Sequence, residues 1–426
     1  MQQKHVVLTT WGSFGDLHPY LALAKGLQAR GVRASIVTCS FYREKVERAG
    51  IGFYPMRPDL PPLEEVPALA KRLMDGQRGT RAILRELLMP SLQDMYTDID
   101  RAAQDADLLF THPTVYAGPL VAEKRNMKWL SGVLQPIVFV SAYDPPVPST
   151  GPSMPWLRLL PRPAMRALIK AGKRAILRWA REVATLRKEL GLPQGENPIF
   201  EGQFSPYGTI ALFSRCLAEA QPDWPVKVHL AGFAFYDRFS DDKGGLEPDL
   251  EAFLNAGEPP ILFTLGTSAV LTAGSFYKES IEAVKRLKKR AVLLIGPDPK
   301  NRPTEPLPPT IITAVYAPHS VLMPRCSAVV HQGGAGTTGQ AMRAGCPQII
   351  VPFSHDQPDN ASRIVRGGMG RTIMRRFYRS RRVARELNRI LTDPAILARA
   401  ADVGRYMQSE DGVANACDII IKTMES

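Results

Sequence analysis

The 426-residue sequence has few cysteines and no long apolar run, and each absence excludes a class of protein. Its five cysteines are odd in number, far apart and without a C-x-x-C pair, so neither a disulfide framework nor a cysteine zinc site is indicated. No uncharged apolar stretch reaches the roughly 18 residues that span a bilayer, and the N-terminus lacks the features of a signal peptide. We therefore expect a cytoplasmic protein.

The composition is that of a folded protein, not of a disordered or fibrous one. Hydrophobic residues make up 45% and charged residues 22%, both ordinary for a soluble globular chain. At roughly 100–200 residues per domain, the length predicts two or three domains.

Charge is the one unusual figure, with a net value of +13 that would suit nucleic acid. The excess lies in two segments: residues 155–190 carry ten Lys/Arg against two Glu, and residues 363–389 carry ten Arg against one Glu. These basic residues are not interleaved with the aromatics that stack on bases, so we predict no nucleic-acid partner. Two solvated helical faces would explain both segments.

The first half of the chain alternates strands with helices. His5–Thr10 is typical of a buried parallel strand, a helical stretch follows until Gly31, and Arg33–Thr38 forms a second strand. Asp107–Phe110 and Val133–Val140 are further strand-like runs. The pattern predicts a parallel sheet covered by helices.

A second α/β series follows a polar stretch at 236–247 that is typical of an interdomain linker. Its expected strands are Ile261–Leu265, Ala291–Ile295, Thr310–Thr313, Ala328–Val330 and Gln348–Val351. The fold class predicted is α/β, with two Rossmann-like domains facing a cleft: residues 1–235 and residues 248–426, the last helix being free to return to the first domain. In such sheets ligands bind outside the carboxyl ends of the strands.

The loop Gly12–Pro19 directly follows the first expected strand. It is not G-x-G-x-x-G, and no G-x-x-x-x-G-K-[ST] occurs anywhere, so hydride transfer and ATPase chemistry lose their main support. Asp16 and His18 could each serve as a general base there. Alternatively, one of them only caps a helix that Pro19 begins.

A second loop, His331–Gln340, carries glycines at 333, 334 and 336 between a strand and a helix. Glycine lets the backbone approach a ligand, and the amides at a helix start form an anion site suited to a diphosphate. Thr337 and Thr338 add hydroxyl donors. The alternative is a structural glycine-rich turn.

Two further loops carry polar side chains after buried strands. Asp356 and Gln357 combine a carboxylate with an amide, which can grip a polyol, although solvated turn residues would look the same. Thr267 follows a strand and Gly266, where a phosphate contact and a simple turn are equally compatible with the residues.

Together these motifs resemble the inverting glycosyltransferases of the GT-B fold (glycosyltransferase family 1 type), which include sterol, antibiotic-aglycone and plant natural-product glucosyltransferases. The stretch from His331 to Ala361 is similar to the nucleotide-sugar signature of that family, and G-S-F-G-D-L-H-P at 12–19 is similar to the G-x-x-G-D-x-x-P opening of its sterol and glycopeptide members. A shorter match, at 221–225 and 231–233, resembles bacterial rhamnosyltransferases.

The resemblance implies transfer of a hexose from a UDP- or dTDP-linked sugar to a hydroxyl of a hydrophobic acceptor, with inversion. It makes Asp16 the catalytic base. The donor-binding residues it implies are Thr267, Ala317, Pro318, His331, Gln332, Gly333, Gly334, Ala335, Gly336, Thr337, Thr338, Gln340, Asp356 and Gln357. The acceptor-side candidates are Gly12, Ser13, Phe14, His18 and His112.

The sequence departs from the family pattern at three places. Gln332 replaces the usual His before Gly-Gly, with His331 one place earlier, so either could touch the diphosphate. Gln340 replaces the usual ribose-binding Glu, which leaves uridine and deoxythymidine both open. His112 stands where plant members have the Asp that orients a catalytic His, and a satisfied pocket histidine is the alternative there.

No D-x-D pair is present, so we expect neither a metal nor a resident cofactor. Two other functions stay open: a nucleotide-sugar epimerase of the same fold, and a non-catalytic accessory protein that activates a partner transferase. Apolar and basic residues alternate at helical spacing in 155–190, which predicts an amphipathic helix that contacts the inner face of a membrane, or an ordinary domain helix.

Overall fold

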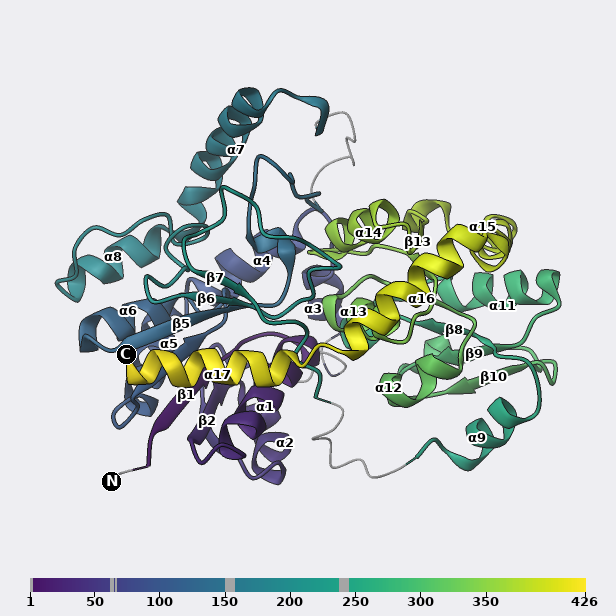
Figure 1. Ribbon diagram of the computed structural model, residues 1–426, viewed down its shortest axis with the longest axis horizontal. Coiled ribbons are helices and arrows are strands. Elements are labelled where there is room, and N and C mark those ends of the chain that lie inside the picture. The colour runs from purple at the N-terminus through teal and green to yellow at the C-terminus, as the bar shows by residue number, and fades with distance from the viewer. Residues whose placement is uncertain (1–2, 62–64, 66, 150–157, 237–244) are drawn as a thin grey trace. The chain divides into compact units, whose positions relative to one another are not determined.

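The computed structural model describes residues 3–61, 65, 67–149, 158–236 and 245–426 (Figure 1). The chain forms two compact units: Met1–Pro62, Arg78–Asp241 and Asp411–Ser426 make the first, and Leu63–Gln77 with Asp242–Glu410 make the second. Residues 63–77 therefore belong with the second unit, although the sequence placed them in the first domain. Most of the predicted linker, 237–244, lies outside the described residues.

The first unit is built on a seven-stranded sheet in the order β3-β2-β1-β4-β5-β6-β7, and every neighbouring pair is parallel. Its strands are β1 (His5–Thr9), β2 (Arg33–Thr38), β3 (Gly52–Pro55), β4 (Leu108–Thr111), β5 (Lys128–Val133), β6 (Thr209–Ala211) and β7 (Val228–Leu230). Its helices are α1 (Phe14–Gln28), α2 (Arg43–Arg48), α4 (Gly79–Ala82), α5 (Leu92–Ala102), α6 (Ala117–Arg125), α7 (Arg162–Leu177), α8 (Arg181–Glu189) and α17 (Gly412–Glu425).

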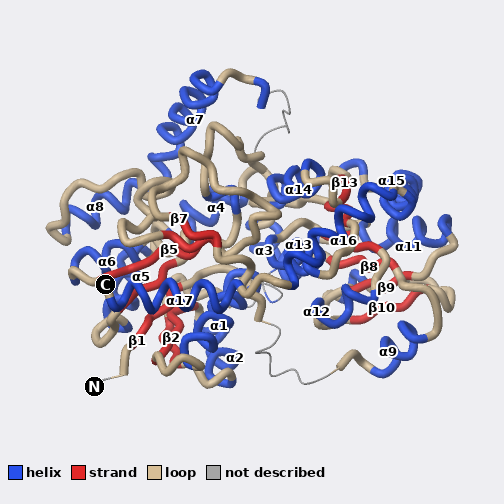
Figure 2. Tube along the Cα trace, in the orientation of Figure 1, coloured by secondary structure: helices blue, strands red, loops and turns tan. Residues whose placement is uncertain are grey.

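The second unit has a six-stranded parallel sheet in the order β10-β9-β8-β11-β12-β13. Its strands are β8 (Ile261–Thr264), β9 (Ala291–Leu294), β10 (Ile311–Ala314), β11 (Ala328–His331), β12 (Gln348–Ile350) and β13 (Gly370–Thr372). Its helices are α3 (Pro67–Leu73), α9 (Pro248–Asn255), α10 (Gly266–Ala269), α11 (Phe276–Leu287), α12 (His319–Leu322), α13 (Ala335–Arg343), α14 (Gln357–Arg366), α15 (Ser380–Thr392) and α16 (Pro394–Gln408). Figure 2 shows the strands of each unit surrounded by helices.

The strand order reverses once in each sheet, between β1 and β4 in the first unit and between β8 and β11 in the second. At such a switch point the loops leave the sheet in opposite directions and open a crevice at the carboxyl ends of the strands. All four strands are completely buried and mostly apolar, as strands covered on both faces must be. The loops that follow them carry Asp16, His112, Thr267 and Gln332.

Helix α17 packs in the first unit, against α1. A Cβ atom at Gly26 of α1 would lie 2.6 Å from Val413 Cγ1 and 2.8 Å from Cys417 Sγ, so glycine is what allows the two helices to approach. The end of the chain thereby completes the core of the unit in which the chain begins.

Two local predictions were wrong. The run Val133–Val140 is not a strand: β5 ends at Val133, and Pro136–Val138 forms a 3-10 turn (η4), because proline cannot donate to a sheet ladder. The segment 155–190 is not one helix either, since a 3-10 turn at Arg178–Ala180 (η6) separates α7 from α8.

Candidate active site

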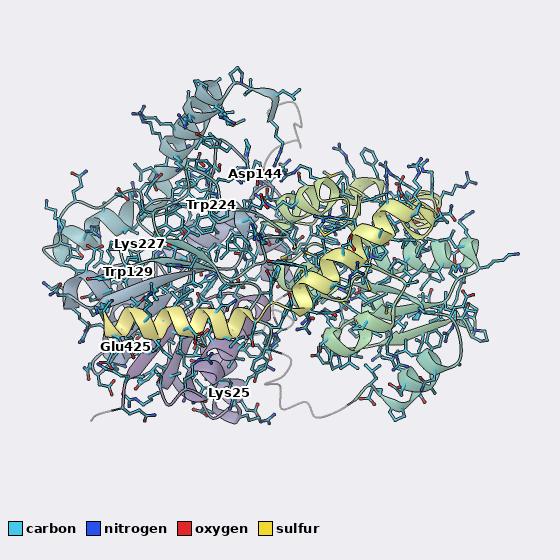
Figure 3. The ribbon with its side chains drawn as sticks, viewed as in Figure 1. Lys25, Trp129, Asp144, Trp224, Lys227 and Glu425 are labelled. Atoms are coloured by element: carbon cyan, nitrogen blue, oxygen red, sulfur yellow. The ribbon has the colours of Figure 1, made fainter. Side chains whose placement is uncertain are left out.

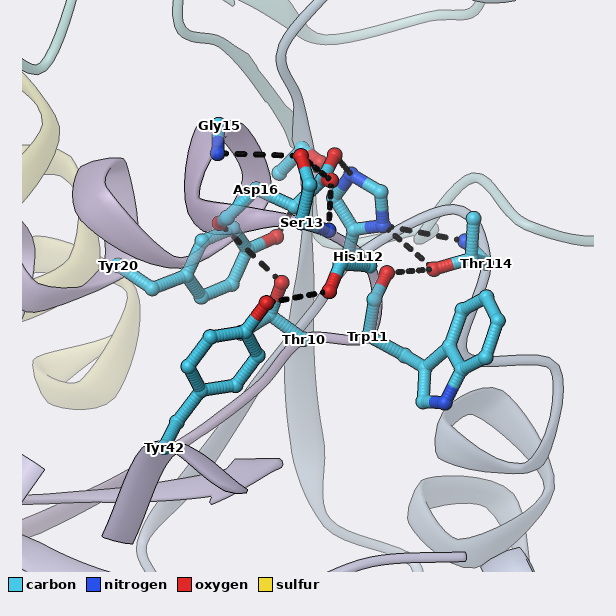
Figure 4. A network of polar contacts seen from close by, with 11 residues as sticks. Thr10, Trp11, Ser13, Gly15, Asp16, Tyr20, Tyr42, His112 and Thr114 are labelled. Carbon is cyan, nitrogen blue, oxygen red and sulfur yellow. Dashed lines mark hydrogen bonds and ion pairs between the residues drawn. The ribbon is translucent and has the colours of Figure 1, made fainter. Parts of the chain in front are cut away.

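Asp16 lies in the first turn of α1, where the loop after β1 holds its carboxylate (Figure 4). Ser13 is the N-cap residue, and its backbone N–H and hydroxyl donate to Asp16 Oδ2 at 2.7 and 3.1 Å. This is a capping box, in which side chains satisfy helix-start donors that have no partner within the helix. Gly12 adopts φ +147°, and a Cβ atom there would collide with Asp16 Oδ2. The carboxylate therefore folds back into a space that only glycine leaves free.

The capping alternative thus holds for one oxygen of Asp16. The helix it caps begins at Phe14, however, and Pro19 lies inside α1, so the expected start at Pro19 was wrong. The second oxygen, Oδ1, lies 3.7 Å from Nε2 of His112. Because the side chain of Asp16 is 21% exposed, this carboxylate can still meet a ligand.

His112 follows β4, the neighbour of β1 across the switch point. Its Nδ1 atom lies 2.7 Å from Thr114 Oγ1, and the Thr114 hydroxyl donates in turn to the Trp11 carbonyl oxygen at 2.9 Å. Burial lowers the pKa of His112 in spite of the negative charge of Asp16, so the ring is neutral at neutral pH. Among the described residues Nε2 has no hydrogen-bond partner. The imidazole is therefore fixed on one side only.

The remaining acceptor-side candidates surround Asp16 without all facing it. Two residues along a helix are about 200° apart around its axis, so His18 points away from the carboxylate. Its ring stacks on Tyr236 at 5.4 Å and tilts against Phe14 at 5.5 Å. Gly12 and Ser13 position Asp16, whereas Phe14 and His18 belong to an aromatic cluster.

The loop between β11 and α13 is shaped by its glycines. Gly333 adopts φ +94°, and a Cβ atom there would lie 2.6 Å from Ile350. Gly334 is the N-cap residue and provides no side-chain cap, so the amides at Ala335, Gly336 and Thr337 lack intrahelical partners. These amides and the helix dipole form a positive end suited to an anion.

His331 and Gln332, the two alternatives for the diphosphate, differ in position. His331 is fully buried: its Nδ1 accepts from the Gly333 N–H at 3.1 Å, and Nε2 lies 2.9 Å from Gln348 Oε1. Since Nδ1 accepts, Nε2 carries the proton and donates. Burial lowers the pKa of His331 to about 4. His331 therefore holds the loop in place from the protein interior.

Gln332 lies between the two loops of the switch point. A Cβ atom at Gly266, which adopts φ +62°, would lie 2.5 Å from Gln332 Nε2, so the β8 loop passes close to this amide. Gln332 Oε1 is buried and has no hydrogen-bond partner among the described residues. An unsatisfied amide oxygen beside an anion site is unusual, because it costs free energy unless a ligand or water pairs with it.

The threonines differ in exposure. Thr267 is exposed at the start of α10, whereas Thr337 is buried with 8% of its surface still exposed. Thr338 is completely buried, so its hydroxyl lies away from the surface that the α13 amides present.

Asp356 and Gln357 open α14 and are both engaged. Asp356 Oδ2 accepts from Asn360 Nδ2 at 2.7 Å, and the same Nδ2 donates to the Gly333 carbonyl oxygen at 2.8 Å. Gln357 Oε1 accepts from the backbone N–H groups of Phe353 and Ser354 at 2.8 and 3.1 Å. The Gln357 oxygen is thus used within its own loop, and Asn360 ties the Asp356 loop to the glycine loop.

Ala317 and Pro318, which the family resemblance implies as donor-binding residues beside a nucleobase, follow β10 together with Tyr316. Tyr316 is 63% exposed after β10, whereas Ala317 is 2% exposed and packs in the core of the second unit. Gln340 lines a small cavity of about 80 Å³ together with His319 and Arg343. The exposed face of this region is therefore Tyr316 with Pro318 beside it.

Three supporting residues escaped the sequence analysis: Thr114, Gln348 and Asn360. Thr114 holds His112 from within the same loop, Asn360 holds Asp356 at the start of α14, and Gln348 of β12 holds His331 of the neighbouring strand. Only Asn360 had a sequence signal, because it lies four residues after Asp356 and thus on the same helix face.

Two family models match the chain. The glycosyltransferase family 28 N-terminal domain matches residues 6–126, and the C-terminal domain of erythromycin biosynthesis protein CIII-like proteins matches residues 279–422. The first match covers the loops of Asp16 and His112, and the second covers the loops of Gly333 and Asp356.

Curated relatives match over nearly all of this chain. The O-mycaminosyltylonolide 6-deoxyallosyltransferase of Streptomyces fradiae is 31% identical over 433 residues, which cover 99% of this chain and 98% of that protein. The sterol 3-beta-glucosyltransferase of Emericella nidulans is 29% identical over 99% of this chain, but the chain spans only 30% of that protein. Among solved structures, spinosyn forosaminyltransferase superposes with a TM-score of 0.73 at 16% identity, and the spinosyn rhamnosyltransferase complexed with thymidine diphosphate with 0.67 at 17%, each over all of both chains.

The buried His331 predicts how stability depends on pH. Its pKa in the folded protein, about 4, lies below the usual 6.5, so the unfolded chain binds more protons between these values. Stability contributed by the neutral ring is present above pH 6.5 and is lost as the pH falls toward 4. Between pH 7 and pH 5, the free energy of unfolding measured in urea should fall less for His331→Asn than for wild type. The difference between the two should be on the order of 2 kcal/mol. The exposed His229, changed to Asn, is the control and should leave the pH dependence unchanged.

Proposed function

The chain belongs to the GT-B glycosyltransferases, and we propose that it transfers a hexose from a UDP- or dTDP-linked sugar to a hydroxyl of a hydrophobic acceptor, with inversion. The observation that carries the proposal is the carboxylate of Asp16, fixed through one oxygen and accessible through the other at the switch point of the first unit. The uncapped glycine loop at the switch point of the second unit supports a nucleotide-diphosphate donor. The names of the relatives favour a natural-product aglycone or a sterol as acceptor.

On the acceptor side, Asp16 acts as the general base. Its Oδ1 accepts the proton of the acceptor hydroxyl while that oxygen attacks the anomeric carbon of the donor. The bond from the anomeric carbon to the diphosphate oxygen breaks, and its electron pair leaves with the nucleotide. Neutral His112, 3.7 Å from Oδ1, contributes no positive charge that would weaken the base.

On the donor side, the α13 amides and the Thr337 hydroxyl stabilise the charge that develops on the leaving diphosphate. Of the two candidates beside them, Gln332 contacts the diphosphate through its amide donor Nε2, and His331 supports the loop, because both ring nitrogens of His331 are already engaged within it. Asp356 accepts a hydrogen bond from a sugar hydroxyl, and Tyr316 with Pro318 backs the nucleobase. We expect transfer to proceed in the presence of a chelator.

The two other functions are separable by one assay. A nucleotide-sugar epimerase converts its donor without an acceptor, and an accessory protein converts none by itself. Release of nucleotide diphosphate that depends on an added acceptor excludes both. Thermal shift with UDP- and dTDP-sugars then identifies the donor, because a ligand at 100 times its Kd stabilises by about 2.7 kcal/mol.

Asp16→Asn should abolish transfer and leave nucleotide binding intact. The amide oxygen can still accept from the Ser13 N–H, so α1 stays capped, but the group no longer takes a proton at neutral pH. Loss of a general base typically costs ~10²–10⁴-fold in rate. Activity is measured as acceptor-dependent nucleotide release, and binding as nucleotide-induced thermal shift. Full activity in this variant would move the role to His112.

Thr337→Val and Asp356→Ala should weaken use of the donor in different ways. Thr337→Val removes a diphosphate contact and should weaken free nucleotide diphosphate as well, by the ~1–3 kcal/mol typical of an unsatisfied polar group. Asp356→Ala should spare the free nucleotide and penalise only the sugar-bearing donor. Calorimetric titration with both ligands distinguishes them, and equal effects on free nucleotide would refute the assignment.

Helix α7 supports a contact with a membrane surface. Of its 16 residues only Met165 is buried, and it carries five basic and no acidic residues. Leu168 and Leu177 are 47% and 43% exposed. By contrast, Val183 and Leu186 of α8 pack in the core of the first unit, so the ordinary domain helix describes that half of the predicted segment. Figure 1 shows α7 at the margin of the first unit, away from its sheet.

We propose that α7 rests on anionic lipid and so brings the enzyme to hydrophobic acceptors. None of the helices within the described residues is long and apolar enough to cross a membrane. Each Lys or Arg near an anionic surface contributes about 1 kcal/mol, within a Debye length of ~8 Å at physiological salt. Lys173 pairs with Glu201 at 2.5 Å, and Arg162 and Arg166 lie over the Tyr143 ring, so we assign the lipid contact to Lys170, Arg174 and the adjacent Arg178.

Vesicle co-sedimentation tests this contact. Binding should require anionic lipid, fall steeply with added salt, and drop when Lys170, Arg174 and Arg178 are changed to Glu. The matched control changes the exposed Lys278, Lys288 and Lys300 of the second unit to Glu. It alters the net charge equally and should bind anionic vesicles better than the α7 variant does. If wild type ignores anionic vesicles at low salt, α7 is only a solvated helix.

A further inference from the structure

The first unit contains a cavity of about 270 Å³ that no step of the proposed mechanism uses. It lies between α6, α8 and the segment 194–206. Most of its wall is apolar and comes from several elements, including Val115, Leu120, Trp129, Val183 and Phe204. Figure 3 labels Trp129, which β5 contributes to this wall.

The cavity follows one face of α6. Its lining residues Tyr116, Pro119, Leu120 and Glu123 have the spacing i, i+3, i+4 and i+7, which places them in one stripe along the helix. Seven residues of helix rise by about 10 Å, so the space is elongated. Its ends differ, because Thr111 and His112 line it where α6 begins and Glu123 lines it where α6 ends.

Three charged groups at the far end, Glu123, Arg187 and Glu201, are already paired, whereas Gln203 Oε1 is buried without a hydrogen-bond partner among the described residues. Arg187 donates to both carboxylate oxygens of Glu123 at 2.9 and 2.6 Å, and a Cβ atom at Gly195 would lie 2.8 Å from Arg187 Nε. Glu201 is paired with Lys173, and Gln203 Nε2 donates to the Ile199 carbonyl oxygen at 2.6 Å. A ligand in the cavity would therefore meet apolar walls between two polar ends.

We propose that this cavity holds a slender hydrocarbon chain of the acceptor, which rests on the function proposed above. Its wall includes His112, whose Nε2 lies 3.7 Å from the base Asp16, so a chain seated there belongs to the molecule whose hydroxyl is deprotonated. The volume falls just below the ~300–1,000 Å³ of sites for whole drug-sized ligands, so an arm of the acceptor enters and not a fused ring system.

A series of primary n-alkanols from butanol to tetradecanol tests the proposal, as ligands and as acceptors. Each added methylene buried should tighten binding about fourfold, as ~0.8 kcal/mol per methylene implies. The gain should stop near eight carbons, because an extended chain advances ~3.5 Å per three bonds and the cavity is about 10 Å long. Binding is measured by titration calorimetry, and transfer as KM for each alkanol.

Two variants of Leu120 should change, in opposite directions, the alkanol length at which affinity stops rising. Leu120→Phe fills the middle of the cavity and should make this length shorter, whereas Leu120→Ala should make it longer. Leu92→Ala is the control, because Leu92 is equally buried in the first unit at 3% exposure and lies outside the cavity wall. If Leu120→Phe does not fold, the shift in Leu120→Ala decides.

The outcomes separate this inference from the proposed function. Affinity that does not rise with chain length, or a limit that neither Leu120 variant moves, overturns the cavity assignment even where transfer is observed. A limit that shifts as expected while no donor and acceptor pair gives transfer supports the cavity and contradicts the proposed function. Transfer together with a shifted limit in KM supports both.

Discussion

The capping box at the start of α1 fixes the carboxylate of Asp16, and the candidate site of the first unit is arranged around it. Oδ2 closes the helix by accepting two hydrogen bonds from Ser13, which leaves Oδ1 for chemistry. The glycine at 12 is required because a Cβ atom would occupy the place of that carboxylate. In the proposed mechanism a single residue thus serves two roles, with Oδ2 as the helix cap and Oδ1 as the general base.

In the second unit, hydrogen bonds likewise fix the glycine loop. The Gly333 N–H donates to the His331 ring, and Asn360 donates both to the Gly333 carbonyl oxygen and to Asp356. The backbone amides of α13 stay without a side-chain cap, while His331 and Asn360 hold the loop before them through hydrogen bonds to Gly333. Preorganisation of this kind is what electrostatic stabilisation of a leaving group demands, because donors already in place need not reorganise during the reaction.

Much of this could be predicted from sequence where the signal is local. The strand at Arg33–Thr38 was predicted with its observed bounds, and the loops of Asp16, Gly333 and Asp356 each follow a buried strand as expected. The start of α1 was misplaced because Pro19 is a strong helix-start signal, yet the capping box of Ser13 and Asp16 begins the helix five residues earlier.

What the sequence could not reveal are contacts between distant elements. The burial of His331 against Gln348, the approach of Gly266 to Gln332 and the approach of His112 to Asp16 join residues 17 to 96 positions apart. The same holds for the grouping of 63–77 with the second unit. Propensity and periodicity describe single segments, so such contacts need the folded sheet order before they can be inferred.

In the proposed mechanism, the carboxylate base drives a single direct displacement at the anomeric carbon. The most direct measurement is the anomeric configuration of the first product, determined by proton NMR during turnover with a nucleotide sugar of known configuration. A single displacement predicts a product of the opposite configuration. A product that retains the configuration of the donor would contradict the account, because it would require a second displacement that the fixed Asp16 carboxylate alone does not provide.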